Sequence, residues 1–144
     1  MRTRLGHARV GELATVRPDG TPHVVPVCFA LDGDTVVSAV DAKPKTTTEL
    51  RRLANVRANP AGGLLVHQYD DADWTRLWWV RVDGRAEVVE RGERRERAIA
   101  LLVDKYAQYR ADPPPGAVIC LAIERWQGWE WGAQPSGRVT SDSS

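Results

Sequence analysis

One short segment of the sequence, DAKPKTTTEL, gathers positive charge and hydroxyl groups where an expected strand meets an expected helix. Pro44 favours an extended conformation at Lys43, and residues two apart in an extended segment point to the same side. Lys43 and Lys45 can therefore act together. Thr46 and Thr47 open the helix, whose first turn presents unpaired N–H groups and the positive end of its dipole. Such a junction can hold a phosphate group.

The same segment also has an ordinary structural interpretation. Thr46 and Glu49 have the spacing of a capping box, with Thr46 as N-cap and Glu49 three positions later. Glu49 brings negative charge into the turn unless it bonds back to the Thr46 amide. The junction also lacks the glycines of a Walker A loop. On spacing alone, a solvated helix start is the simpler interpretation, and phosphate binding stays open beside it.

No other segment carries a recognised catalytic or metal-binding pattern. The three histidines are scattered without the spacing of metal ligands, and no G-x-S-x-G element is present. The acidic run at 70–73 lacks the glycine and the terminal glutamate of a calcium loop, so we interpret it as a solvated turn. We therefore predict no metal site.

Tryptophan is used unusually often, with six residues against a single phenylalanine. Trp78 and Trp79 are adjacent in an expected strand, where alternation sends Trp79, Arg81 and Asp83 to one face and Trp78 to the other. A face that combines these residue types can line a subunit interface or a cleft for a planar ligand. A tryptophan that caps a barrel beside a surface arginine is the plainer alternative.

The pattern along the chain predicts a mainly β protein with α additions. Strands are expected at 13–17, 21–31, 35–40, 62–69, 77–90 and 117–131, and helices at 3–11, 49–60 and 93–106. The first three strands read as a meander, Pro26 indicates an edge strand or a bulge, and Asp83-Gly84 indicates a bend. About six strands in hairpin-like succession, with two to three helices, favour an antiparallel barrel over a βαβ sheet.

Length and composition indicate one soluble domain. The chain has 144 residues, which suits a single domain at 1–131 followed by a polar tail at 132–144 that we expect to be disordered. The net charge of +1 argues against nucleic acid or an anionic membrane as partner. The longest apolar run, 117–123, is too short to span a bilayer. Cys28 and Cys120 are expected to be buried free thiols, and a cytoplasmic location fits them.

Four segments taken together resemble one family: 14–34 (ATVRPDGTPHVVPVCFALDGD), 40–60 (VDAKPKTTTELRRLANVRANP), 69–84 (YDDADWTRLWWVRVDG) and 105–119 (KYAQYRADPPPGAVI). They resemble the pyridoxamine-5′-phosphate-oxidase-like flavin and deazaflavin proteins, and among these the actinobacterial class of F-420-dependent oxidoreductases. The resemblance runs from about residue 8 to residue 132. It implies a split antiparallel β-barrel (the FMN-binding split barrel) that forms a homodimer, with cofactor sites between the subunits.

The resemblance also implies roles for individual residues. Lys45, Thr46 and Thr47 match positions that hold the cofactor phosphate, with Lys43 as a helper, and this changes our interpretation of the junction to phosphate binding. Ser38, Ala39 and Val40 match the strand that lies along the cofactor ring, and Val25, Pro26 and Val27 match the neighbouring strand. Asn55 matches a position that contacts the cofactor tail. Trp79 matches a residue that the partner subunit contributes.

The implied function is hydride transfer from reduced coenzyme F-420 to a small conjugated organic substrate. FMN is the alternative cofactor, and a non-catalytic flavin or deazaflavin carrier is the alternative role. Arg51, Arg52 and Arg57 offer positive charge to the carboxylate tail of F-420, which favours the deazaflavin. No catalytic residue is assigned, since Tyr69 and bulk water are equally acceptable proton donors. The Arg-x-His element of the vitamin-processing oxidases is missing, so oxidation of pyridoxamine phosphate is not expected.

Overall fold

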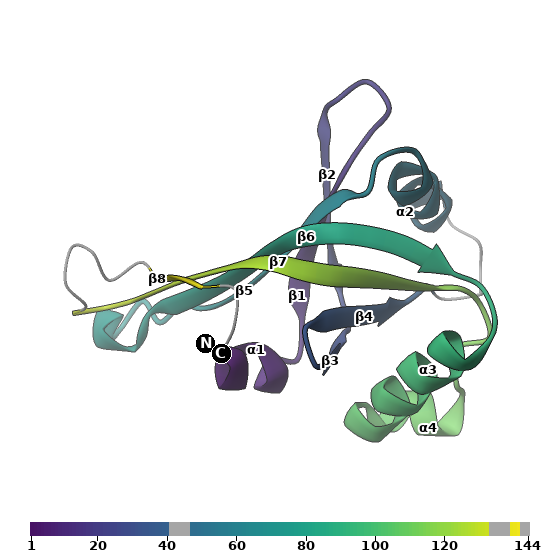
Figure 1. Cartoon of the computed structure of the whole chain (residues 1–144). Coiled ribbons are helices and arrows are strands. Elements are labelled where there is room, and N and C mark those ends of the chain that lie inside the picture. The colour runs from purple at the N-terminus through teal and green to yellow at the C-terminus, as the bar shows by residue number, and fades with distance from the viewer. Residues whose placement is uncertain (41–46, 133–138, 142–144) are drawn as a thin grey trace.

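The computed structural model describes residues 1–40, 47–132 and 139–141 of the chain (Figure 1). The elements in order are α1 (Arg2–His7), β1 (Gly11–Val16), β2 (Pro22–Val27), β3 (Ala30–Asp32), β4 (Thr35–Ala39), α2 (Thr47–Ala58), β5 (Ala61–Gln68), the 3-10 turn η1 (Trp74–Arg76), β6 (Trp78–Val89), α3 (Glu93–Lys105), α4 (Ala107–Ala111), β7 (Val118–Glu130) and β8 (Val139–Ser141). The described residues thus form eight strands and four α-helices. These numbers exceed the prediction because the 21–31 run divides into two strands, and because β8 and α4 have no clear signal in the sequence.

All eight strands belong to one antiparallel sheet with the order β2-β1-β5-β6-β7-β4-β3, and β8 pairs with β7. The long strands β6 and β7 run through the middle of the molecule (Figure 1). The predicted antiparallel, mainly β architecture is confirmed, and β2 is an edge strand, as Pro26 indicates. The predicted meander is wrong, because β4 pairs with β7 and β3 rather than following β2.

The break between β2 and β3 explains this different topology. The chain leaves β2 at Cys28 and turns Phe29 into the core, where its side chain is fully buried. The Phe29 N–H donates to the hydroxyl oxygen of Tyr106 at 3.1 Å. That hydroxyl also lies 2.9 Å from the Arg9 carbonyl oxygen. A tyrosine 77 positions away therefore satisfies the backbone where the strand ends.

The predicted bend at Asp83-Gly84 is confirmed as a register shift between β6 and β7. A side chain at position 84 cannot be accommodated, since its Cβ would overlap the Ala122 carbonyl oxygen. Glycine therefore permits the close approach of β7 and lets β6 curve. This curvature makes the inside of the sheet concave enough to enclose a core.

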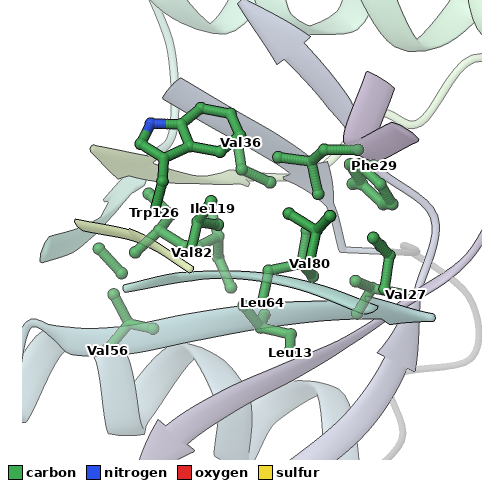
Figure 2. Close-up of a cluster of buried hydrophobic side chains, with 14 of the residues drawn as sticks. Leu13, Val27, Phe29, Val36, Val56, Leu64, Val80, Val82, Ile119 and Trp126 are labelled. Atoms are coloured by element: carbon green, nitrogen blue, oxygen red, sulfur yellow. The ribbon is translucent and has the colours of Figure 1, made fainter. Parts of the chain in front are cut away.

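The main apolar cluster fills the inside of the curved sheet (Figure 2), and Leu5 of α1 and Val56 of α2 close it from outside the sheet. A second cluster lies beneath α3, where Ile99 and Leu102 pack near Cys120 of β7. The members of the main cluster labelled in Figure 2 are Leu13, Val27, Phe29, Val36, Val56, Leu64, Val80, Val82, Ile119 and Trp126. The two clusters together cover both faces of β4.

Three residues of the predicted C-terminal tail, Val139–Ser141, form β8 against Trp126–Gly128 of β7. The rest of that tail beyond residue 132 lies outside the described residues, so its disorder stays a prediction. Cys28 and Cys120 are both free, as expected, but only Cys120 is buried, whereas Cys28 is half-buried because it lies where the chain leaves β2. Among the described residues, no helix combines the length and the apolar character needed to cross a membrane.

Candidate functional site

The strand predicted to lie along the cofactor ring is buried within the single chain. Ser38, Ala39 and Val40 are 3%, 8% and 6% exposed. Val40 belongs to the main cluster and Ala39 to the cluster beneath α3. The β3–β4 ladder, however, spans only Thr35–Val37. The β3-facing edge of Ser38 and Ala39 therefore has no partner strand in the described part of the chain, and its backbone groups can meet the polar edge of a planar ring.

The three predicted residues of β2 do not share one face. Val27 is buried in the main cluster, and Val25 packs against that cluster. Pro26 is exposed on the opposite face of β2, and its partner in the neighbouring strand β1 is Glu12. Alternation along a strand requires this separation. The structure thus brings Val25 and Val27 into the same cluster as Val40 but turns Pro26 away from them.

The predicted contact of the cofactor tail, Asn55, is engaged within the protein. Its side chain is 1% exposed, and its Nδ2 donates to the Thr15 Oγ1 at 3.2 Å. This bond joins the middle of α2 to β1. Any role of Asn55 toward a cofactor stays a prediction, and its described contact holds the helix in place.

The phosphate junction lies largely outside the described residues. Lys43, Lys45 and Thr46 fall in the undescribed segment 41–46, and Thr47 is described only as the first residue of α2. The helix therefore begins where the pattern predicts. The capping pair of Thr46 with Glu49 and the phosphate contacts both stay predictions.

A group of basic residues lies where α2 packs against the β1–β2 hairpin, and we call Arg17, His23, Arg51 and Arg52 the basic cluster. His23 is only 7% exposed, and its Nδ1 has no hydrogen-bond partner among the described residues. Burial, followed by the nearby charges of the three arginines, holds the pKa of His23 below its usual value. The imidazole is therefore neutral and surrounded by positive charge, an environment that suits an anionic ligand.

His23 is a residue whose importance the sequence pattern alone does not reveal, since a scattered histidine has no metal-ligand spacing. One signal was nevertheless present. His23 shares the inward face of β2 with Val25 and Val27, so it is a polar residue in an apolar register. The neighbouring arginines come from a turn and from a helix, and only the tertiary structure brings them together.

The outward face of β6 carries Trp79, Arg81 and Asp83, as alternation predicts, because Val80 and Val82 point into the core. Trp79 lies opposite Trp129 on β7 and opposite His67 on β5. These residues border a cavity of about 520 Å³, which we call the tryptophan recess; it is lined by Leu65, His67, Gln68, Tyr69, Leu77, Trp78, Trp79, Arg81 and Trp129.

A second, largely apolar cavity of about 430 Å³ continues along the same face of the sheet and shares Leu65 and Arg81 with the tryptophan recess. Val24 of β2 lines it and is 56% exposed. We call the two cavities together the outer face. Arg81 is held there by an ion pair with Asp83, Nε to Oδ1 at 3.3 Å, and by a hydrogen bond that it donates to Gln127. The outer face therefore combines apolar area with fixed polar groups, the composition of an interface core and its rim.

The strand order and the helices that cover the curved sheet define a split β-barrel. Residues 1–130 match the family model of pyridoxamine 5′-phosphate oxidase, and the chain belongs to this family. The predicted split-barrel fold is thereby confirmed. A search of curated proteins found no match to this chain.

Several solved structures share the fold. A heme binding protein from Mycobacterium smegmatis has a TM-score of 0.76 and 21% identity over 98% of this chain; this chain spans only 55% of that protein. The conserved hypothetical protein Rv2991 from Mycobacterium tuberculosis has a TM-score of 0.70 and 22% identity, covering 88% of this chain and 79% of its own. HupZ from Group A Streptococcus has a TM-score of 0.64 and 23% identity, covering 91% of this chain and 93% of its own.

Proposed function

We propose that this protein is an F-420-dependent oxidoreductase that transfers hydride to a small conjugated organic substrate. The observation that supports F-420 most directly is the basic cluster. F-420 carries a phosphate and, beyond it, a tail with several carboxylates, whereas FMN carries only the phosphate. Arg51 and Arg52 lie on the first half of α2, directly after the Lys43–Lys45 junction, so positive charge extends beyond the predicted phosphate site. Arginine pairs well with carboxylates.

The residues present fit such a cofactor. The buried Nδ1 of His23 lacks a partner among the described residues and lies in a positive environment, as expected beside an anion. The open edge at Ser38 and Ala39 offers backbone groups to a ring. When bound, a reduced deazaflavin supplies a hydride. The basic cluster would bind the anionic tail, and the strand edge would orient the ring.

A proton source for the substrate is available at the tryptophan recess. Tyr69 lines the recess and is 59% exposed, and its hydroxyl donates to the Asp71 Oδ1 at 2.7 Å. We propose Tyr69 as the donor if the reduced substrate requires a proton from the protein. The aromatic walls of the recess suit a flat, conjugated substrate.

We also propose that the protein acts as a homodimer through the outer face. Its apolar area includes Val24, Leu65 and Trp79, which in a monomer remain open to water. Exposed apolar patches of this kind mark interaction surfaces. In the dimer, Trp79 of each subunit would complete the site of the other. The two free thiols support a reducing, cytoplasmic location.

The cofactor is tested by titrating the purified protein with F-420 and with FMN and following fluorescence. F-420 should bind more tightly, and tighter binding of FMN would select the FMN-dependent alternative. Lys45→Ala should weaken F-420 binding by about 1–3 kcal/mol, the range for losing a charge-assisted bond. Turnover of a panel of enones, quinones and tetrapyrroles by the loaded protein separates an enzyme from a carrier.

Haem binding is a second candidate function. The similar protein from Mycobacterium smegmatis is a heme binding protein. In this chain the tryptophan recess combines planar aromatic walls with the imidazole of His67, whose Nε2 lies 3.3 Å from the Glu12 Oε1. Imidazole is a common axial ligand of haem iron. Titration with haemin should then give a shifted Soret band that His67→Ala alters. If the spectrum of haemin is unchanged by both the wild-type protein and the His67→Ala variant, haem binding is excluded.

A further inference from the structure

Arg95, near the start of α3, is an arginine whose side chain is mostly buried, with only 12% of it exposed. Its Nε donates to the Gly116 carbonyl oxygen at 2.9 Å, and its Nη2 donates to the Pro114 carbonyl oxygen at 2.8 Å. Its Nη1 lies 2.7 Å from the Glu96 Oε2. All three nitrogens of the guanidinium are therefore engaged, and two of them bind the same loop.

That loop, residues 112–117, connects α4 to β7, and we call it the proline loop. It contains three consecutive prolines at 113–115, which have no N–H group and cannot form an ordinary strand ladder. Its carbonyl groups still need donors, and Pro114 is buried. A guanidinium offers several N–H donors in a fixed planar arrangement. Arg95 thus supplies the donors that the backbone of the proline loop lacks.

The proline loop lies directly against the end of β4. The Val40 N–H donates to the Ala117 carbonyl oxygen at 3.1 Å. A Cβ at Gly116 would lie 3.2 Å from the Val40 carbonyl oxygen, so the two backbones are in close contact. One residue earlier, Ala39 pairs with Val118 in the β4–β7 ladder. The proline loop therefore continues this ladder and holds Val40 at one edge of β4.

The opposite edge of β4 carries the proposed contact with the cofactor ring. At Ser38 and Ala39 this edge has no partner strand in the described part of the chain, so the strand is held there from the β7 side alone. The helix that carries Arg95, α3, contacts β3, β4 and β7 (Figure 1). The placement of the open edge therefore depends on β7, on the proline loop and on the contact of that loop with α3.

We propose that Arg95 is a positioning residue for the cofactor site. By binding two carbonyl oxygens of the proline loop, it fixes Val40 and thereby orders the open edge at Ser38 and Ala39. This role rests on the function proposed above, since it needs a cofactor ring at that edge. Arg95 acts through the loop, not on the tail of the cofactor. Its loss should therefore affect F-420 and FMN alike, because the two cofactors share the ring system.

The experiment uses Arg95→Gln in the full chain and has two readouts. Without cofactor, exchange of the Val40 amide hydrogen, followed by NMR, should become at least about tenfold faster, because the lost hydrogen bonds are charge-assisted. Amides in the middle of the β6–β7 ladder should keep their rates. In fluorescence titrations of the folded variant, the affinities for F-420 and for FMN should both fall by about tenfold.

Arg97→Gln is the matched control, because it removes the same charge from the same helix. Arg97 is 71% exposed and pairs with Asp32 at 2.8 Å, and surface pairs of this kind contribute little. Both readouts should stay at their wild-type values in this variant. If Arg95→Gln does not fold, Arg95→Lys gives the same comparison with a smaller loss, because lysine keeps the charge without the planar donor group.

Each readout can contradict the proposal separately. An unchanged exchange rate of Val40 in Arg95→Gln would show that Arg95 does not order the end of β4. Faster exchange with unchanged affinities would leave Arg95 a structural residue only, and equal affinity losses in Arg95→Gln and Arg97→Gln would reflect charge alone. If the wild type binds neither cofactor, the proposed function fails and the positioning role fails with it, whereas the exchange rates still decide whether Arg95 holds Val40.

Discussion

Asn55 in the middle of α2 donates a hydrogen bond from Nδ2 to the Thr15 Oγ1 of β1 at 3.2 Å, and both side chains are almost completely buried. This bond attaches α2, the helix that carries Arg51 and Arg52, to the barrel. The basic cluster therefore depends on a polar contact inside the protein. Buried polar pairs of this kind are costly to break because the remaining partner is left unsatisfied.

Asn55→Ala should lower the free energy of unfolding by about 1–3 kcal/mol, since it leaves the Thr15 hydroxyl buried without its donor. Thr15→Val is the matching change on the other side, and the double variant should cost less than the sum of the two. Urea denaturation of the four proteins measures this coupling. Additive costs would show that the bond contributes nothing specific. If Asn55→Ala loses more F-420 affinity than its loss of stability explains, the result would instead support a direct contact between Asn55 and the cofactor.

His23 predicts a dependence of stability on pH. Its pKa is lowered in the folded protein, so below pH 6.5 the unfolded chain binds a proton that the folded protein resists. The free energy of unfolding should therefore fall as the pH decreases from 6.5 toward the lower folded pKa. His23→Gln should flatten this part of the profile, because glutamine does not bind the proton. A profile of His23→Gln identical to that of the wild type would rule out the role of His23.

The same histidine predicts a link between protons and anions. Binding of an anion beside the basic cluster should raise the pKa of His23, because the ligand offsets the charges of Arg17, Arg51 and Arg52. Cofactor binding should then be accompanied by proton uptake below pH 6.5. Isothermal titration in buffers of different ionisation enthalpy measures this uptake. If the binding enthalpy in this pH range does not depend on the ionisation enthalpy of the buffer, the anion does not bind beside His23.

Two arginines on α2 allow a matched test of the proposed tail site. Arg51 belongs to the basic cluster, whereas Arg57 is paired with Glu90 at 2.6 Å, and both are exposed. Arg51→Gln should weaken F-420 binding by about 1–2 kcal/mol and FMN binding by less, because FMN lacks the carboxylate tail. Arg57→Gln should leave both affinities nearly unchanged. Fluorescence titration distinguishes the pair, and equal losses in both variants would argue against a specific tail site.

The outer face predicts the oligomeric state. Val24→Glu places a charge on the open apolar surface and should convert a dimer into a monomer, as measured by light scattering after size exclusion. Leu50→Glu is the control, since Leu50 is similarly exposed at 53% but lies on α2, away from that face. A monomeric wild type, or a dimer that survives Val24→Glu, would exclude the outer face as the interface.

Much of the fold follows from local patterns in the sequence. The turn at 18–20, the bend at Asp83-Gly84 and the apolar stripe of α3 depend on neighbouring residues alone, because glycine conformations and helical periodicity are local properties. The resemblance in four segments then identified the split barrel, and Trp79 and Arg81 were assigned to one face by alternation. The role of the Lys43–Lys45 junction in phosphate binding was predicted from the same resemblance and stays a prediction.

Tertiary structure decided what depends on residues far apart in the chain. The end of β2 at Cys28 depends on Tyr106, and the pairing of β4 with β7 depends on a core that several strands share. The basic cluster exists because α2 packs against the β1–β2 hairpin, which surrounds His23 with arginines. Likewise, Lys105 has a lowered pKa only because Phe29 and Arg9 meet it in space. Burial and charge act through distance in the folded molecule, and the order of residues along the chain does not specify that distance.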